Sequence, residues 1–295
     1  MSVVLGEVRP VSADVAELGE GTRWDGERGE LVWVDLLAGV LRTAAPNAAG
    51  QLLTTLELRI DAPLGAAAPL ADGSGWVVAA GDGLALLSRS GAMRWIARPE
   101  RSSGGATRMN DGACDPAGRF WAGSMAYDGT PGAGSLYRLD PDGAVSTVLR
   151  DVTISNGLGW SPDGSTLFYA DTGAATVDAF DYDGDVSNRR TLVQTTAAVA
   201  TDGLTVDDEG FIWAAMWGGG EVRRYAPTGE LDAVVRVPAR QVTCCCFGGS
   251  DGHTLFISTA WIGLTAGERA RTPDAGRVFA VRTAVGGPPA TPFGG

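Results

Sequence analysis

The chain has 295 residues, 44% of them hydrophobic, so it is long enough to bury a sizeable core in one large domain or two ordinary ones. Its formal net charge of −12 argues against nucleic acid and anionic membranes as partners, because both are bound through basic patches. It contains no lysine and a single histidine, His253, which excludes Schiff-base chemistry at a lysine, a P-loop lysine and a metal site built from several histidines.

Neither a membrane helix nor an exported, disulfide-bonded protein is indicated. No apolar run reaches the ~18 residues of a membrane span, and the N-terminal "MSVVLGEVRP" lacks the basic and apolar regions of a signal peptide. The four cysteines are Cys114 and the run Cys244-Cys245-Cys246, which form neither a disulfide framework nor a CxxC pair. We therefore expect buried thiols in a reducing compartment and a cytoplasmic protein.

Six segments share one shape, in which a turn with Asp or Gly precedes a short apolar run that holds an aromatic residue. In chain order the aromatic residues are Trp33, Trp76, Trp121, Phe168, Trp213 and Phe256. The intervals between them are 43, 45, 47, 45 and 43 residues. Such regular spacing indicates an internal repeat.

A second strand-like run follows each aromatic segment, for example "GSLYRLDPDG" and "TVDAFDYDGD". No segment shows a convincing amphipathic helix with caps. Repeats of ~40–50 residues that hold several strands are typical of a β-propeller, whereas a large β-sandwich would not explain the period. We predict an all-β fold, a six-bladed β-propeller with four-stranded blades around a central channel.

The prediction treats residues 1–295 as a single propeller domain. The N-terminal run "SVVLGEV" is expected to join the last blade and close the ring. Residues 283–295, with the sequence "GGPPATPFGG" at their end, are expected to form a loosely ordered tail.

Four repeats carry an oxygen-bearing side chain at an equivalent position, 11–13 residues before the aromatic residue that defines the repeat. These side chains are Glu20, Asn110, Asn156 and Asp202. The innermost strand of a blade lines the channel, and in each repeat it would directly precede the aromatic run, so we expect these side chains to meet at the channel mouth. Asx-Gly pairs are also ordinary turn formers. Glu is a poor turn residue, however, and all four residues occupy equivalent positions of the repeat. Arg108 lies two residues before Asn110 and would face the channel with it.

Carboxylate and amide oxygens together form a hard cation site. Such ligands suit Ca²⁺ best, with Zn²⁺, Mg²⁺ or Mn²⁺ as possible substitutes. Three protein ligands would leave coordination positions open for water and substrate, as a catalytic metal requires.

The chain resembles the senescence-marker-protein / gluconolactonase / luciferin-regenerating-enzyme family, which includes regucalcin and bacterial sugar lactonases. The matching stretches are "LGEGTRW", "RMNDGACDPAGRFWAGSM", "SNGLGWSPDGSTLFYADT", "TDGLTVDDEGFIWAAMWGGG" and "CFGGSDGHTLFIST", which span nearly the whole chain in family order. The family fold is a six-bladed propeller, in agreement with the repeat.

The resemblance implies roles for particular residues. It implies that Glu20, Asn156 and Asp202 bind one divalent metal ion, and that Arg108 and Asn110 bind substrate. An acidic residue after the G-[ST]-M run contacts sugar hydroxyls in some members, and the matching residue here is Asp128, in "SMAYDG". One family member carries Glu at this position, so the Asp points to a different substrate.

The resulting hypothesis is the hydrolysis of a sugar lactone or similar cyclic ester. The metal would polarise the ring carbonyl, Asp202 would take the proton from the attacking water, and Arg108 and Asn110 would orient the ring. The oligomeric state is left open. The alternatives are a non-catalytic calcium-binding or regulatory propeller, and a hydrolase of phosphoesters or non-sugar lactones on the same scaffold. Phosphoester chemistry is disfavoured because Arg108 is the only evident basic residue in the channel.

Two motif matches are interpreted as turns between strands. "GGSDG", residues 248–252, matches G-x-S-x-G but occupies the position of a turn in its repeat. "DYDGDV", residues 181–186, resembles the start of an EF-hand loop, but it lacks the glycine at position six and the glutamate at position twelve.

Overall fold

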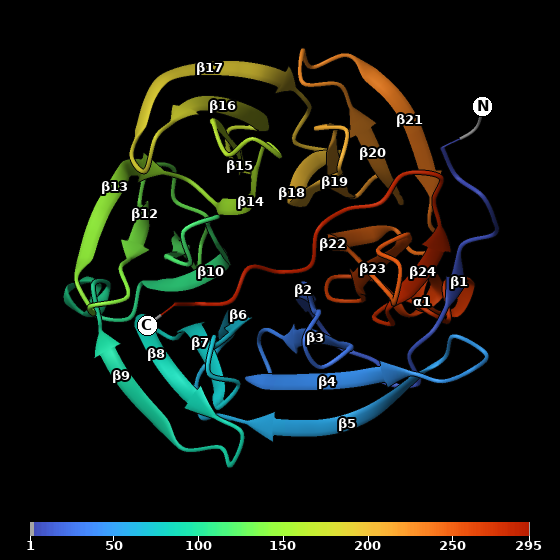
Figure 1. Cartoon of the computed structure of the whole chain (residues 1–295), viewed down its shortest axis with the longest axis horizontal. Helices are drawn as coiled ribbons and strands as arrows, with labels where there is room; N and C mark the ends of the chain where they lie inside the picture. The colour runs from blue at the N-terminus through green and yellow to red at the C-terminus, as the bar shows by residue number, and fades with distance from the viewer. Residues whose placement is uncertain (1–2, 295) are drawn as a thin grey trace.

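The computed structural model describes residues 3–294, which form six four-stranded antiparallel sheets arranged in a ring (Figure 1). In the first five blades the strands are paired in chain order from the channel to the rim. The first strand of each blade therefore lines the channel. The predicted six-bladed β-propeller is confirmed.

The strands have the following bounds. Blade one contains β2 (Gly19–Asp25), β3 (Glu30–Asp35), β4 (Val40–Pro46) and β5 (Leu52–Arg59), and blade two contains β6 (Leu64–Pro69), β7 (Gly75–Ala80), β8 (Gly83–Ser88) and β9 (Met93–Ala97). Blade three contains β10 (Thr107–Cys114), β11 (Phe120–Ala126), β12 (Gly134–Leu139) and β13 (Val145–Val152), and blade four contains β14 (Ser155–Trp160), β15 (Thr166–Asp171), β16 (Thr176–Tyr182) and β17 (Val186–Gln194). Blade five contains β18 (Ala200–Val206), β19 (Ile212–Trp217), β20 (Glu221–Tyr225) and β21 (Leu231–Arg236).

Blade six joins the two ends of the chain. It contains β22 (Gln241–Gly248), β23 (Thr254–Ala260) and β24 (Phe279–Arg282), and its outermost strand is the N-terminal β1 (Arg9–Pro10), paired with β24. An isolated bridge between Val4 and Thr283 extends the pairing. The expected closure of the ring by the N-terminal run is therefore observed, although the strand itself lies just after that run.

The six reference aromatics all lie on the second strand of their blades and have at most 3% of their surface exposed. A blade cannot bury both of its faces alone, so these large side chains fill the space between neighbouring blades. The two motifs interpreted as turns lie between β22 and β23 and between β16 and β17, as expected.

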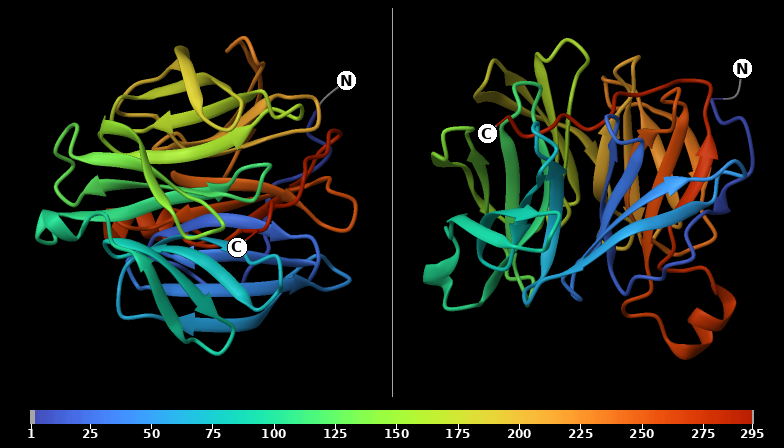
Figure 2. Two further views of the ribbon diagram at one scale, coloured as in Figure 1. Left: turned by 60° about the vertical axis from the view of Figure 1, so that its left-hand side comes forward. Right: turned by 60° about the horizontal axis from the view of Figure 1, so that its bottom comes forward.

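Two short helices lie outside the blades, η1 (Arg101–Ser103) and α1 (Ala266–Arg271). Helix α1 was not predicted from the sequence, although Thr265 and Glu268 have the spacing of a capping box. The Thr265 hydroxyl accepts from the Glu268 backbone N–H, and the Glu268 carboxylate accepts from the Thr265 backbone N–H. This helix follows β23 and lies at the end of the channel where the inner strands begin, which we call the proximal end (Figure 2).

The C-terminal segment 283–294 crosses the opposite, distal end of the channel, where the inner strands finish (Figures 1 and 2). Its backbone N–H groups at Ala290, Phe293 and Gly294 donate to the carbonyls of Trp24, Pro69 and Gly118, and only 2% of the Phe293 surface is exposed. This differs from the loosely ordered tail that we expected. The segment has no strand periodicity, and its order comes from backbone hydrogen bonds to separate blades, which a sequence pattern does not reveal.

The inner strands are irregular where the predicted polar residues lie. Between Glu20 and Arg23 of β2, two residues face one residue of β3, and the same irregularity occurs in blades three, four and five, at Met109/Gly112, Ser155/Leu158 and Thr201/Leu204. Such β-bulges redirect side chains out of the regular alternation. The Glu-Gly and Asx-Gly pairs thus lie within strands and not in turns.

The glycines beside these bulges permit adjacent inner strands to approach closely. A methyl group at Gly157 would lie 2.5 Å from the backbone nitrogen of Leu204, and one at Gly65 would collide with the backbone oxygen of Asn110. Near the axis of a propeller the inner strands converge, so a side chain at these points would push neighbouring blades apart.

Replacing Gly65 by alanine is therefore expected to destabilise the fold by about 1–3 kcal/mol, the usual cost of overpacking. Thermal unfolding followed by circular dichroism would measure the change. Gly6→Ala is the matched control, because nothing lies within 4 Å of the added methyl group at Gly6. Equal melting temperatures for the two variants would contradict the close packing of the inner strands.

Candidate metal and substrate site in the channel

Glu20, Asn156 and Asp202 lie on β2, β14 and β18, the inner strands of three different blades (Figure 1). Each lies near the proximal start of its strand. All three are buried, with between 4% and 6% of their surface exposed. The channel-facing position that the repeat predicted for them is therefore consistent with their burial on the inner strands.

The charges of this group act on one another. Burial raises the pKa of Glu20, and the carboxylates of Asp202 and Asp111 raise it further. Burial also raises the pKa of Asp202, again with a contribution from Asp111, while a hydrogen bond from the Asn156 amide opposes the rise. Carboxylates from blades one, three and five thus lie close enough together to disfavour simultaneous ionisation.

One oxygen of each predicted ligand has no hydrogen-bond partner although it is buried: Glu20 Oε2, Asn156 Oδ1 and Asp202 Oδ1. The orientation of the Asn156 amide is fixed, because its Nδ2 donates to Thr172 Oγ1 over 2.9 Å. Buried oxygens without a partner are costly, and hard oxygens of this kind match the ligand preference of Ca²⁺. The residues present therefore fit a divalent cation.

The cluster differs from metal sites made only of charged or sulfur ligands. Among residues 3–294, no group of three or more His, Cys, Asp and Glu side chains is arranged as a metal site. Glu20 and Asp202 supply two carboxylates, and the third oxygen comes from the amide of Asn156. The three residues form a possible metal site only if Asn156 is a ligand.

Arg108, on β10, has only 7% of its surface exposed, yet it forms no ion pair within the described part of the chain. Its Nη1 donates to Asn110 Oδ1 over 2.6 Å and to the Met109 carbonyl over 3.1 Å, and its guanidinium lies 5.9 Å from the centre of the Tyr127 ring. Burial lowers the pKa of Arg108, while the more distant charges of Glu20, Tyr127 and Asp202 oppose that change. A buried cation without an ion pair is available to an oxygen-rich ligand.

Asn110 connects Arg108 to the next blade. Its Oδ1 accepts from Arg108, and its Nδ2 donates to the carbonyl of Ser155 over 2.8 Å. Both ends of the amide are thus engaged within the protein. This arrangement holds the guanidinium of Arg108 in place beside β14.

Asp128 is not drawn into this group. It is exposed in the connection between β11 and β12, where its Oδ1 accepts from both the backbone N–H and the hydroxyl of Thr130. These bonds lower the pKa of Asp128. Contact between Asp128 and a substrate stays a prediction.

Two residues of the channel were missed as members of the site, Asp111 and Arg23. The Asp111 carboxylate accepts from Arg23 Nη2 over 3.2 Å and from the Gly112 N–H over 2.8 Å, while its Oδ2 is buried without a partner. Arg23 also donates to the Cys244 sulfur over 3.3 Å. Asp111 stood in the RMNDG stretch, but its pairing with an arginine 88 residues away has no local sequence signal.

The raised pKa values predict how stability depends on pH when no divalent cation is bound. A carboxyl whose pKa is raised by folding stabilises the fold below its unfolded pKa, and this contribution is lost as the pH rises through the folded pKa. In the presence of a chelator, the melting temperature should therefore fall from about pH 4 upward.

Glu20→Gln should reduce this fall, because it removes one of the two buried charges that ionise. The measurement is thermal unfolding across pH in chelator, with the exposed Glu27→Gln as the matched control. A Glu20→Gln profile as steep as that of the Glu27→Gln control would contradict the interpretation.

The chain is similar to known proteins over nearly its whole length. Residues 18–261 match the family model described as "SMP-30/Gluconolactonase/LRE-like region". Regucalcin from Gallus gallus is 37% identical over 98% of this chain and 99% of its own length. The protein named "Putative sugar lactone lactonase YvrE" from Bacillus subtilis (strain 168) is 34% identical over 95% of this chain and 96% of its own.

A solved structure shows the same arrangement. The crystal structure of a regucalcin from Agrobacterium tumefaciens, described as a calcium-binding protein, superposes with a TM-score of 0.89 at 29% identity, covering 98% of this chain and 97% of that one. Within residues 3–294, neither helix has the length and apolar character that a membrane span requires.

Proposed function

Because the chain belongs to the SMP-30/gluconolactonase/LRE-like family, we propose that it is a lactonase that opens the ring of a sugar lactone. The observation that carries the proposal is the set of buried oxygens without partners on Glu20, Asn156 and Asp202. The charges of Glu20 and Asp202 also act on Arg108. These groups provide an oxygen site for a cation and a donor for substrate oxygens in one channel.

In this proposal Glu20, Asn156 and Asp202 hold one divalent cation, with Ca²⁺ the best match to their hard oxygens. When bound, such a cation polarises the carbonyl of an ester and stabilises the negative charge that develops on its oxygen. The description of the Agrobacterium tumefaciens relative as a calcium-binding protein supports the choice of metal.

Asp202 is assigned the role of general base. Its carboxylate accepts a proton from the water that adds to the lactone carbonyl carbon, and the proton passes to the ring oxygen as the ring C–O bond breaks. The products of the balanced reaction are the carboxyl and hydroxyl groups of a hydroxy acid.

Arg108 orients the substrate in this scheme. Its Nη1 is held by Asn110 and the Met109 carbonyl, which leaves the other side of the guanidinium for a carbonyl or hydroxyl oxygen of the substrate. Asn110 is therefore assigned as the residue that positions Arg108. Fixing the ring in this way lowers the entropic cost of the reaction.

The test is a pH-indicator screen of aldonolactones against Ca²⁺, Zn²⁺, Mg²⁺ and Mn²⁺. Acid release with at least one lactone, dependent on the cation, is the expected result. Saturable Ca²⁺ binding without turnover of any lactone would instead favour a non-catalytic calcium-binding propeller, the alternative suggested by the description of the Agrobacterium tumefaciens protein. Turnover of aryl esters but not of sugar lactones would favour a different hydrolase.

A further inference from the structure

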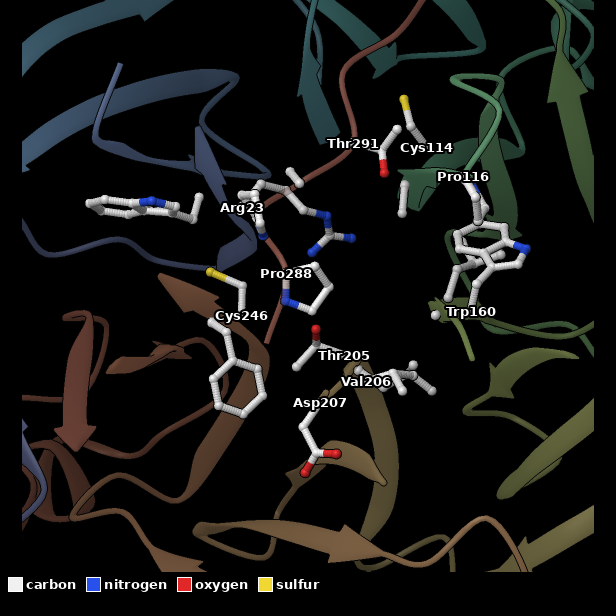
Figure 3. Close-up of a pocket in the computed structure, with 18 of the residues that line it drawn as sticks. Arg23, Cys114, Pro116, Trp160, Thr205, Val206, Asp207, Cys246, Pro288 and Thr291 are labelled. Carbon is white, nitrogen blue, oxygen red and sulfur yellow. The ribbon is translucent and has the colours of Figure 1, made fainter. Parts of the chain in front are cut away.

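A cavity of about 370 Å³ lies at the distal end of the channel, opposite the site described above (Figure 3). Its walls come from the finishing ends of the inner strands of five blades, and the C-terminal segment contributes residues 288–291. The volume falls within the ~300–1,000 Å³ typical of small-molecule sites. Glu20, Asn156, Asp202 and Arg108 do not line it.

The walls of this distal cavity are largely apolar and aromatic. Leu158, Pro288 and Trp160 contribute apolar surface, whereas Trp24 and Phe247 have only 5% and 1% of their surface exposed and line the cavity mainly by their edges and backbone. One face of the Trp24 ring is stacked on Phe256 with the two ring centres 5.5 Å apart, which fixes the indole rigidly. Partly apolar walls of this kind favour a ligand with an apolar body.

Three polar side chains that face the cavity keep a donor group without an acceptor. Figure 3 shows the Arg23 guanidinium and the hydroxyls of Thr205 and Thr291 directed toward its centre. Four N–H groups of Arg23 are used by Thr22, Cys244, Asp111 and Gly112, whereas its Nε–H has no partner within residues 3–294. Neither threonine hydroxyl has a hydrogen-bond partner there either.

Asp111 already accepts from Arg23 Nη2, and the other carboxylates near the distal cavity do not match the donors that remain. The side chain of Asp207 points away from the cavity in Figure 3 and accepts from Trp213 Nε1 and Arg224. Asp208 is exposed at the rim, where solvent screens its charge. An acceptor for the inward-facing donors must therefore come from a ligand or from water.

We propose that the distal cavity is a second binding site, separate from the lactonase site, for a small apolar carboxylate such as an aryl carboxylate. The apolar part packs against Trp160, Leu158 and Pro288. The carboxylate lies against Arg23 Nε–H and accepts from Thr205 and Thr291. The buried ion pair of Arg23 with Asp111 separates this ligand from the proximal oxygens.

The test uses 2-naphthoate as the probe and the quenching of tryptophan fluorescence as the readout, with 2-naphthylmethanol as the ligand control. The alcohol keeps the rings but removes the charge, so it should bind about tenfold more weakly, the difference expected for a hydrogen bond to a charged group. The double variant Thr205→Val/Thr291→Val should weaken binding of the acid by a similar factor. Thr130→Val, at the proximal end, is the matched control and should leave binding unchanged.

Further measurements distinguish binding at the distal cavity from the proposed lactonase function. Binding of 2-naphthoate should be unaffected by a chelator and by Glu20→Gln, even if no lactone is hydrolysed. The proposal would be overturned by the absence of saturable binding, by equal affinity for the acid and the alcohol, or by equal affinity of the wild type and the double valine variant. Loss of binding on chelation would also overturn it, because it would place the probe at the proximal site.

Discussion

Asp202→Asn is expected to lower kcat/KM for lactone hydrolysis by about 10³-fold, within the range that loss of a general base produces. The substitution keeps the shape of the side chain but removes the charge that would take the proton and help to hold the cation. Because burial and the nearby Asp111 disfavour ionisation of Asp202, the neutral amide should not destabilise the chelated protein. A pH-stat assay with a saturating divalent cation would measure the rate.

The matched control is Asp128→Asn, the same chemical change at an exposed turn near the proximal end. In the present account it changes KM at most and leaves kcat close to that of the wild type. If Asp202→Asn were folded and as active as the control, Asp202 could not be the base. Thermal unfolding of both variants in chelator shows whether lost activity reflects lost structure.

Arg108→Met is expected to lower kcat/KM by about 10- to 100-fold, the equivalent of one charge-assisted hydrogen bond to substrate. Methionine fills a similar volume without charge. No carboxylate is left without its ion-pair partner by this change, because Arg108 forms no ion pair in the described structure. Asn110 Oδ1 and the Met109 carbonyl each lose a donor. The protein should therefore stay folded, with the loss confined to substrate binding and turnover.

Arg101→Met is the control, since Arg101 is an exposed arginine on η1, just before β10. It tests whether removing any positive charge near the proximal end reduces activity through the overall field. Equal losses for the two variants would assign the effect to long-range attraction of the substrate. Steady-state kinetics at two ionic strengths distinguishes this field effect from direct contact.

The fold was predictable because its repeat is carried by large buried side chains. Each blade needs an aromatic residue on its second strand to fill the space to its neighbour, so Trp33, Trp121 and Trp213 report the period directly. The C-terminal segment was not predictable in the same way. Its order depends on backbone hydrogen bonds to blades one, two and three, and backbone groups are identical in every sequence.

The candidate site was partly predictable for a related reason. Glu20, Asn156 and Asp202 occupy equivalent positions of the repeat. A β-bulge lies at or beside each of them, on β2, β14 and β18, so their local backbone is similar. Asp111 and Arg23 were missed because their pairing crosses from blade one to blade three within the channel. The distal cavity had no sequence signal at all, since its walls are the ends of five inner strands and a segment without periodicity.

The central claim is that oxygens from three blades hold one divalent cation on which lactone hydrolysis depends. The most direct measurement is the rate of aldonolactone hydrolysis before chelation, after chelation, and after Ca²⁺ is restored, for the wild type and Glu20→Gln. We predict activity that disappears on chelation and returns with Ca²⁺ in the wild type, and a much higher Ca²⁺ requirement in the variant. Full activity of the wild type in chelator, or an unchanged Ca²⁺ requirement in Glu20→Gln, would contradict the claim.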